Sequence, residues 1–339
     1  MPAPAQPPLS SAASASHPWL VADIGGTNAR FGWVDGRSEA VQHVRTLSVP
    51  DFSDPAAAAQ AYLAQLNTLL GSDFQPPHRA AFAVATAVAG DRIELTNSHW
   101  SFSRQQVQSE LDLQALLVLN DFEALALSLP RLQPTQWRAH GAAPLHQGTL
   151  AVIGPGTGLG VAGVLQTSAG WVALASEGGH ATLAAGDEFE SALLARVRQD
   201  FPHVSAERLL SGIGLPVLHG ALADVLDQAS PPLSTEQIVA LGLSGADPLC
   251  AQSLDMFCAL LGSFAGNVAL TLGARGGVYI GGGIVPRLGE MFFASRFRER
   301  FEAKGRFRSY LEEIPTALIT DTLAALTGAA LAIEQYRQA

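Results

Sequence analysis

The segment LLVLNDFEALAL, residues 116–127, carries the clearest fold signal in the chain. Its four leading apolar residues predict a buried strand, and the apolar spacing that follows predicts a helix. Ligands of open α/β sheets bind just beyond the carboxyl ends of the strands, where Asn120 and Asp121 fall. The simpler interpretation of this pair is helix capping, for which both residue types are favoured. The segment alone leaves both interpretations open.

The composition limits the class of protein. The chain has 339 residues, 48% hydrophobic and 15% charged, which predicts a folded chain of one large domain or two. A net charge of −10 argues against a nucleic-acid partner. No apolar run of about 18 residues lacks polar breaks, so we expect no membrane span. Two cysteines allow no disulfide framework and favour a cytoplasmic location. Residues 1–17, rich in Pro, Ala and Ser, predict a flexible extension.

A strand, a glycine-rich turn and a returning strand open each half of the chain. The first turn is Gly25-Gly26-Thr27-Asn28, and the second is Gly156-Thr157-Gly158. Successive backbone N–H groups in such turns form anion-binding concavities, and glycine lets phosphate oxygens approach closely. Asp23, at the end of the first strand, suits a hydrated Mg²⁺ ion, a type of metal that prefers carboxylates and phosphates. The alternative is a pair of ordinary Gly-rich turns. The recurrence itself predicts an internal repeat.

Further polar and glycine-rich segments follow predicted strands of the second half. Glu177 and His180 come after a strand at 171–175, and Glu207 follows a short loop, where a first-turn helix acid is the alternative. Three glycines after the strand at 277–280 suit a flat adenine or a phosphate. The basic stretch 296–308 favours a solvated face over a phosphate contact. The polar, proline-containing stretch 130–147 predicts an irregular connection, and the apolar spacing in 248–272 predicts a long helix.

Together these motifs resemble those of the bacterial glucokinase family, in the hexokinase/actin-type superfamily. Seven stretches match in family order from about residue 19 to the C-terminus. They are Asp23-Ile24-Gly25-Gly26-Thr27-Asn28-Ala29-Arg30, Thr96-Asn97 with Trp100, Asn120-Asp121-Phe122, Gly156-Thr157-Gly158-Leu159-Gly160-Val161-Ala162, Glu177-Gly178-Gly179-His180, His203-Val204-Ser205-Ala206-Glu207-Arg208 and Gly281-Gly282-Gly283-Ile284-Val285-Pro286-Arg287.

The resemblance implies an α/β fold of two ribonuclease-H-like domains around an interdomain cleft. On this basis residues 18–130 and 321–339 form a small α/β domain, and 131–320 a large α+β domain. The C-terminal helix is expected to return to the first domain. The resemblance also suggests a homodimer that closes on sugar and ATP.

The resemblance further implies ATP-dependent phosphorylation of D-glucose at its 6-hydroxyl, with Mg²⁺. Asp121 is then the general base, a role that suits a carboxylate ionised at neutral pH. The remaining site residues fall into two groups by expected ligand. The sugar ligands are Asn97, Asn120, Asp121, Glu177, His180 and Glu207, and the nucleotide and phosphate ligands are Asp23, Gly25, Gly26, Thr27, Asn28, Gly156, Thr157, Gly158, Gly281, Gly282 and Gly283.

Two departures from the family pattern are visible. A proline expected near Ala87 is missing, and 321–328 differs from the usual Asn-Pro-Gly pattern. The Cys-rich zinc motif of the other bacterial sugar-kinase group is absent, so His180 is interpreted as a sugar ligand. Two other functions stay open: a kinase for another hexose, and a non-catalytic sugar sensor.

Overall fold

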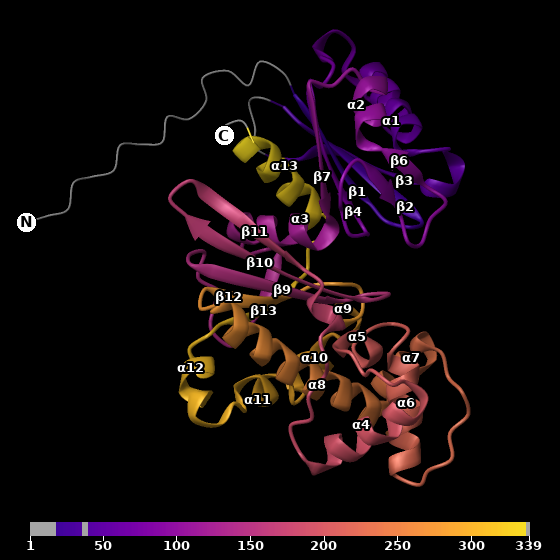
Figure 1. Cartoon of the computed structure of the whole chain (residues 1–339), viewed down its shortest axis with the longest axis vertical. Coiled ribbons are helices and arrows are strands. Elements are labelled where there is room, and N and C mark those ends of the chain that lie inside the picture. Colours follow the sequence, from indigo (N-terminus) through magenta and orange to yellow (C-terminus); the bar gives the residue numbers. More distant parts are fainter. Residues whose placement is uncertain (1–17, 36–39, 337–339) are drawn as a thin grey trace, which may run out of the picture. The chain divides into compact units, whose positions relative to one another are not determined.

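The computed structural model describes residues 18–35 and 40–336, so the predicted extension at 1–17 lies outside it. The described chain divides into two compact units. The first comprises described residues of 1–124 and 325–339, and the second comprises 125–324 (Figure 1). The domain limits expected from the sequence, after 130 and before 321, both fall within the second unit. Each unit has its own hydrophobic core.

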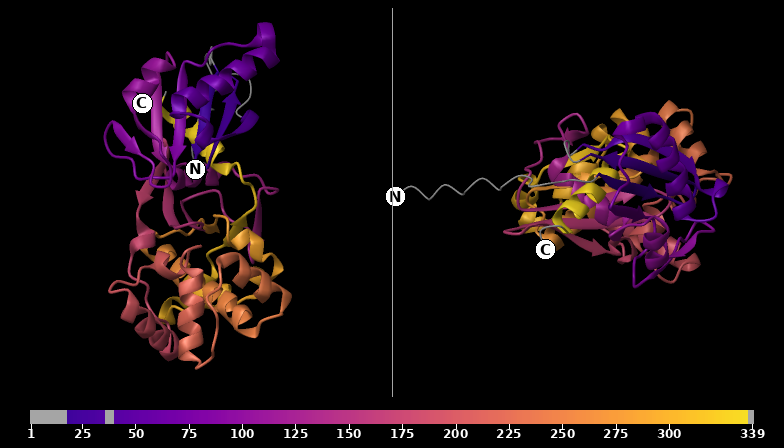
Figure 2. Two further views of the ribbon diagram at one scale, coloured as in Figure 1. Left: turned by 90° about the vertical axis from the view of Figure 1, so that its right-hand side faces the viewer. Right: turned by 90° about the horizontal axis from the view of Figure 1, so that it is seen from above.

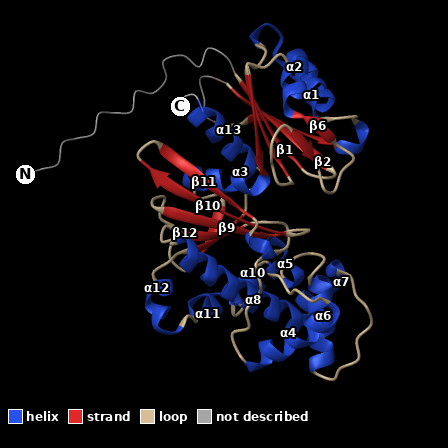
Figure 3. Ribbon diagram, in the orientation of Figure 1, coloured by secondary structure: helices blue, strands red, loops and turns tan. Residues whose placement is uncertain are grey.

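The first unit is built on a five-stranded sheet with the order β3-β2-β1-β4-β7. Figure 3 shows the strands of the chain in red and its helices in blue. Its strands are β1 (Trp19–Ile24), β2 (Asn28–Val34), β3 (Gln42–Ser48), β4 (Arg79–Val84) and β7 (Ala115–Asn120). Strands β1, β4 and β7 run parallel, and β2 and β3 return antiparallel. Central β1 and β4 are almost wholly buried, as expected of apolar strands covered on both faces. A small hairpin of β5 (Arg92–Glu94) and β6 (Ser101–Ser103) completes the unit.

The second unit repeats this topology in a six-stranded sheet with the order β11-β10-β9-β12-β13-β8. Its strands are β8 (Trp137–His140), β9 (Thr149–Pro155), β10 (Leu159–Thr167), β11 (Gly170–Ser176), β12 (Gly277–Ile280) and β13 (Thr316–Ile319). Its first five strands in this order, β11 to β13, run in the same relative directions as the five strands of the first unit. The internal repeat predicted from the two turns is therefore confirmed.

The sixth strand, β8, lies in a stretch that the sequence predicted to be irregular. It pairs antiparallel with β13, which is far away in sequence. The prediction was wrong because four residues of mixed polarity carry no local strand signal, and only the distant partner supplies the hydrogen bonds.

The helices surround these sheets. The first unit has α1 (Pro55–Leu70), α2 (Arg104–Glu110) and the C-terminal α13 (Ala324–Tyr336), and α3 (Asp121–Ser128) spans the junction in sequence. The second has α4 (Glu188–Asp200), α5 (Ala206–Leu209), α6 (Leu215–Val225), α7 (Thr235–Ser244), α8 (Pro248–Leu272), α9 (Val285–Leu288), α10 (Glu290–Ala294), α11 (Phe297–Glu302) and α12 (Arg308–Glu312). The two further views in Figure 2 show α13, in yellow, beside the indigo strands of its unit.

Helix α8 is the central helix of the second unit, with α6, α7 and α11 packed against it. Its bounds follow from local signals. The Asp247 carboxylate accepts hydrogen bonds from the N–H groups of Leu249 and Cys250, Pro248 occupies the first turn, and Gly273 ends the helix with φ +61°. The helix is long and apolar enough to cross a membrane, but 78% of its most apolar window is buried in the fold. We therefore assign it as a core helix.

Two glycines of α8 let α11 approach closely. A Cβ atom on Gly262 would lie 2.0 Å from the carbonyl oxygen of Phe297, and one on Gly266 would lie 2.5 Å from that of Phe301. Backbone atoms cannot move aside as a flexible side chain can. The small residues therefore fix the separation of the two helices.

Gly262→Ala is expected to lower the free energy of unfolding by about 3 kcal/mol, since the added methyl group overpacks this contact. Gly220→Ala in α6 is the matched control, because a Cβ atom there meets nothing within 4 Å. Its higher helix propensity should stabilise the protein by up to about 1 kcal/mol. Urea unfolding of both variants measures the difference. Equal effects would refute the close-packing argument.

Candidate functional site

The candidate site residues of the first unit gather at the carboxyl edge of its sheet. Strands β1, β4 and β7 end in register there, with Ile24 opposite Val84 and Val84 opposite Asn120. Helix α3 begins directly after β7, at Asp121. This edge is where ligands of parallel α/β sheets bind. The strand and helix predicted around 116–127 are thus confirmed as β7 and α3. The sheet order places β7 next to β4.

Asn120 acts as a helix cap. Its Oδ1 accepts the N–H of Phe122 at 2.9 Å, and its Nδ2 donates to the carbonyl oxygen of Thr86 at 3.1 Å. The capping interpretation is therefore correct for this residue. The same bonds tie the end of β7 to the segment after β4, which holds the start of α3 and hence Asp121 in place. One amide proton of Asn120 is left for another acceptor.

Asp121 is a carboxylate whose acidity is shifted toward neutrality. Burial, followed by the negative charge of Asp23, raises the pKa of Asp121 to about 6. Its Oδ1 accepts the N–H of Phe122 at 2.9 Å, which opposes part of the shift. Burial also raises the pKa of Asp23, against the effect of Arg30, whose Nη1 lies 3.0 Å from the Asp23 Oδ2. The edge therefore holds two carboxylates that repel each other, with one of them paired to a cation.

If Asp121 is a base, kcat/KM for the substrate should rise about tenfold per pH unit and level off above about pH 6, because only the ionised form accepts a proton. Asp23→Asn should move the inflection to lower pH, since it removes the charge that raises the pKa of Asp121. A steady-state pH series on both proteins measures this shift. A flat profile from pH 5 to 8 would argue against a base at this position.

The first glycine turn presents free backbone donors. The N–H of Gly25 donates to the carbonyl oxygen of Asn28 at 2.9 Å. No acceptor for the N–H groups of Gly26 or Thr27 occurs among residues 18–35 and 40–336. A Cβ on Gly26 would lie 2.4 Å from the Asn97 carbonyl oxygen, so the loop carrying Asn97 packs on this turn. Two adjacent unpaired N–H groups are what an anion-binding turn requires.

The second turn has the same character. The N–H of Gly156 donates to the Gly158 carbonyl oxygen at 2.8 Å, and those of Thr157 and Gly158 have no acceptor in the described part of the chain. The glycine triplet 281–283 lies beside it, since the N–H of Gly281 donates to Ile153 at 2.8 Å. A Cβ on Gly282, where φ is +75°, would lie 2.3 Å from the Pro155 carbonyl oxygen. Close approach and positive φ both require glycine at this position.

Three predicted sugar ligands of the second unit lie together. Glu177 directly follows β11, and His180 closes the short 3₁₀ turn Gly178–His180. The isolated bridge between Thr182 and Ser205 brings the chain after His180 alongside the chain before Glu207. The Nε2 of His180 lies 4.0 Å from Glu177, and its Nδ1 lies 3.8 Å from Glu207. A histidine between two carboxylates offers donors and acceptors in one small area.

Glu207 also reaches the second turn. Its Oε2 accepts the N–H of Leu159 at 2.8 Å, and a Cβ on Gly158 would lie 2.4 Å from the same oxygen. The side chain is 26% exposed, compared with 62% for His180. Although Glu207 does occupy the first turn of α5, its carboxylate points to the turn and to His180. It therefore links the three predicted sugar ligands to the second glycine turn.

Sequence reasoning missed Arg30 as the partner of Asp23. The hairpin register places the two directly opposite each other across the first turn. The centre of the turn lies between Gly26 and Thr27. Counting residues outward from that centre along both strands pairs Asp23 with Arg30. The described residues contain no group of three or more His, Cys, Asp or Glu side chains that could hold a metal ion.

Comparisons with known proteins identify the family of the chain. The glucokinase family model matches residues 20–336. The glucokinase of Aromatoleum aromaticum is 49% identical over 324 residues, covering 95% of this chain and 96% of that protein. The crystal structure of a glucokinase from an Antarctic psychrotroph has a TM-score of 0.86 and 37% identity, covering 94% of this chain and 99% of that one.

A more distant structure shares the fold alone. It is a ROK family glucokinase from Streptomyces griseus, solved with glucose and AMPPNP, with a TM-score of 0.59 and 19% identity over 93% of this chain and 98% of that one. The mixed α/β architecture is thus that of known sugar kinases. With the family model spanning nearly the whole described chain, this protein belongs to the glucokinase family.

Proposed function

We propose that this enzyme transfers the γ-phosphoryl group of ATP to the 6-hydroxyl of D-glucose, giving glucose 6-phosphate at the entry to glycolysis. The family membership supports the reaction. The observation that carries the proposal is the position of Asp121, a carboxylate at the carboxyl edge of a parallel sheet with a pKa of about 6. At neutral pH it is ionised and still basic enough to take a hydroxyl proton.

Asp121 accepts the proton of the 6-hydroxyl as that oxygen attacks phosphorus. Asn120 keeps it in place through its bonds to Phe122 and Thr86, and its remaining amide proton serves a neighbouring sugar hydroxyl. Asn97, in the loop that packs on the first turn, approaches the sugar or its phosphoryl group. Little covalent chemistry is required of the protein, because phosphoryl transfer depends mainly on positioning and charge.

Glu177, His180 and Glu207 bind the remaining hydroxyls of the sugar. His180 lies 4.0 Å from Glu177 and 3.8 Å from Glu207, which supports a shared ligand, and a hydroxyl left unpaired there would be rejected strongly. The two Gly-Thr turns, each with two unpaired N–H groups, hold phosphate oxygens. In the first turn the backbone carbonyl oxygen of Asn28 accepts the N–H of Gly25, which closes the turn around the proposed phosphate position. The triplet of Gly281, Gly282 and Gly283 forms part of the nucleotide pocket.

The residues present fit a Mg²⁺ ion. Asp23 and Asp121 lie close enough for the charge of one to raise the pKa of the other, and Arg30 pairs with only one oxygen of Asp23. Such an arrangement suits a cation that keeps most of its waters and binds through one or two carboxylates. Asp23 would hold the ion through water, and the ion would supply positive charge to the ATP phosphates.

The architecture is proposed to consist of two ribonuclease-H-like domains that serve one sugar and one ATP. The repeated order and direction of strands in the two sheets support this. We also propose a cytoplasmic homodimer. The two free, buried cysteines, Cys250 and Cys258, suit a reducing compartment. Light scattering coupled to gel filtration tests the dimer.

A coupled ADP-release assay against a panel of hexoses tests the function. Glucose should give the highest kcat/KM. If fructose, mannose or an amino sugar gave a higher kcat/KM than glucose, that sugar would be the substrate instead. Glucose binding by calorimetry without turnover of any sugar would instead favour the sensor function.

A further inference from the structure

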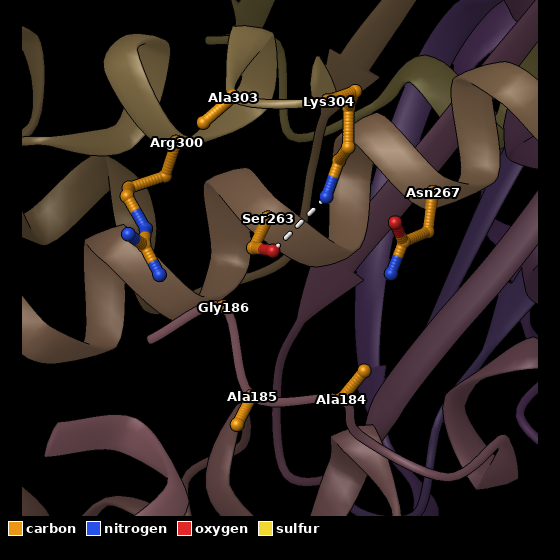
Figure 4. A pocket seen from close by; sticks show the side chains of 8 residues that line it. All are labelled: Ala184, Ala185, Gly186, Ser263, Asn267, Arg300, Ala303 and Lys304. Atoms are coloured by element: carbon orange, nitrogen blue, oxygen red, sulfur yellow. Dashed lines mark hydrogen bonds between the residues drawn. The ribbon is translucent and has the colours of Figure 1, made fainter. Parts of the chain in front are cut away.

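The second unit contains a cavity whose lining includes none of the residues assigned to glucose or ATP. Its volume is about 240 Å³. The lining comes from the loop after Leu183, from α8, and from the end of α11 and the residues following it (Figure 4). The lining residues are Ala184, Ala185, Gly186, Ser263, Asn267, Arg300, Ala303 and Lys304. The set contains two cationic side chains and no acidic one.

Lys304 is the only lysine among the 339 residues, beside 19 arginines. Its Nζ donates to the hydroxyl of Ser263 at 3.0 Å, and Figure 4 shows it pointing toward Ser263 between Arg300 and Asn267. No carboxylate of the described residues lies within 4.0 Å of this ammonium group. Burial and then the charge of Arg300 lower the pKa of Lys304, while the charge of Glu190 opposes the shift. The ammonium group therefore lacks a close counter-ion.

The Lys304 side chain packs closely on α8. A Cβ on Gly266 would lie 2.7 Å from the Cε of Lys304, so the side chain runs directly over the glycine. This packing places a compact ammonium group next to the Ser263 hydroxyl.

Arg300 is neutralised within the protein, unlike Lys304. Its guanidinium pairs with Asp187 and with the fully buried Glu190. The sequence-based interpretation of 296–308 as a solvated face was therefore wrong for Arg300 and Lys304, because their partners lie on distant segments. The buried Nε of Arg300 has no hydrogen-bond partner, and the amide of Asn267 makes none within the described part of the chain. The Arg300 Nε and the Asn267 amide are therefore donors of two lining residues that have no acceptor in the described part of the chain.

We propose that this cavity binds a phosphate-type oxyanion, with Lys304 as its charge partner and Ser263 and Asn267 as its hydrogen-bonding neighbours. The chemistry is that of inorganic phosphate or of a sugar phosphate monoester. A water molecule occupies about 30 Å³, so 240 Å³ exceeds what inorganic phosphate needs and leaves room for an organic group. The site is separate from the two glycine turns and does not depend on the proposed reaction.

The single lysine makes a direct test possible. An amine-acylating ester can label only Lys304 and the α-amino group of the intact protein, and peptide mass spectrometry measures both rates. Phosphate at about ten times its Kd should slow labelling of Lys304 by about tenfold and leave the α-amino group unaffected. Glucose and sodium chloride at matched ionic strength should protect neither. Protection at lower concentrations of glucose 6-phosphate than of phosphate would identify a monoester as the ligand.

Calorimetry tests the same site without a reactive label. Lys304→Gln and Asn267→Ala should each weaken phosphate binding by about tenfold. Circular dichroism melting first establishes that both variants fold. Unchanged binding by the folded variants, or equal protection of Lys304 by sodium chloride, would overturn the proposal.

Discussion

Asp121→Asn is expected to lower kcat by about a thousandfold or more while the Kd for glucose changes by less than about threefold. The amide keeps the shape of the side chain and still offers an oxygen to the N–H of Phe122, which Asp121 accepts at 2.9 Å. It cannot accept the proton of the attacking hydroxyl. Stopped-flow ADP release and glucose calorimetry on the same preparation separate chemistry from binding.

The same substitution should stabilise the protein at neutral pH. Because the pKa of Asp121 is raised in the folded state from 3.8 to about 6, the folded protein favours the protonated carboxyl. That contribution to stability is complete below pH 3.8 and is lost as the pH rises through 6. The variant, which is neutral throughout, should therefore exceed the wild type by about 2 kcal/mol at pH 7.5 and lose this advantage near pH 4.

Asp73→Asn, at an exposed position, is the matched control for charge removal. It should change neither kcat nor the pH dependence of unfolding. Near-normal turnover by Asp121→Asn would exclude the base assignment. A stability gain independent of pH would exclude the burial of a charged carboxylate as its cause.

Glu207→Ala has the second-largest expected effect, a loss of about a hundredfold or more in kcat/KM for glucose. The substitution removes a carboxylate that we propose binds the sugar. That carboxylate is also the neighbour of His180 at 3.8 Å and the acceptor of the Leu159 N–H at 2.8 Å. Leaving that N–H unpaired should also cost about 1 to 2 kcal/mol of stability. Glu207→Gln keeps an oxygen for the Leu159 N–H and loses only the charge. Its kcat/KM and its stability should therefore fall between those of Glu207→Ala and the wild type.

Glu188→Ala provides the control for a purely helical role. Glu188 lies in the first turn of α4 as Glu207 lies in the first turn of α5, but it is exposed. If Glu207 served only the helix dipole, the two alanine variants would behave alike. Steady-state kinetics and urea unfolding on all three variants decide between these roles.

The match between sequence and structure was best where the signals are local. The predicted helix at 248–272 is α8 with the same bounds, because the Asp247 cap, Pro248 and Gly273 act within one turn. Strand β8 was missed because its partner β13 lies far along the chain. For the same reason the pairing of Arg300 with Glu190, 110 residues away, was not predictable from charge pattern.

The sequence by itself determined the strands, turns and helices that have local signals, and which polar residues stand at strand ends. Hydrophobic periodicity, glycine turns and caps act over a few residues, so they can be recognised in the sequence without knowledge of the fold. The tertiary structure alone decided the pairings: Asn120 with Thr86, Glu207 with Leu159, and the carboxylates of Asp23 and Asp121 near each other. Burial and the distance between charges set the acidity of Asp121, and both arise only when remote strands align at one edge.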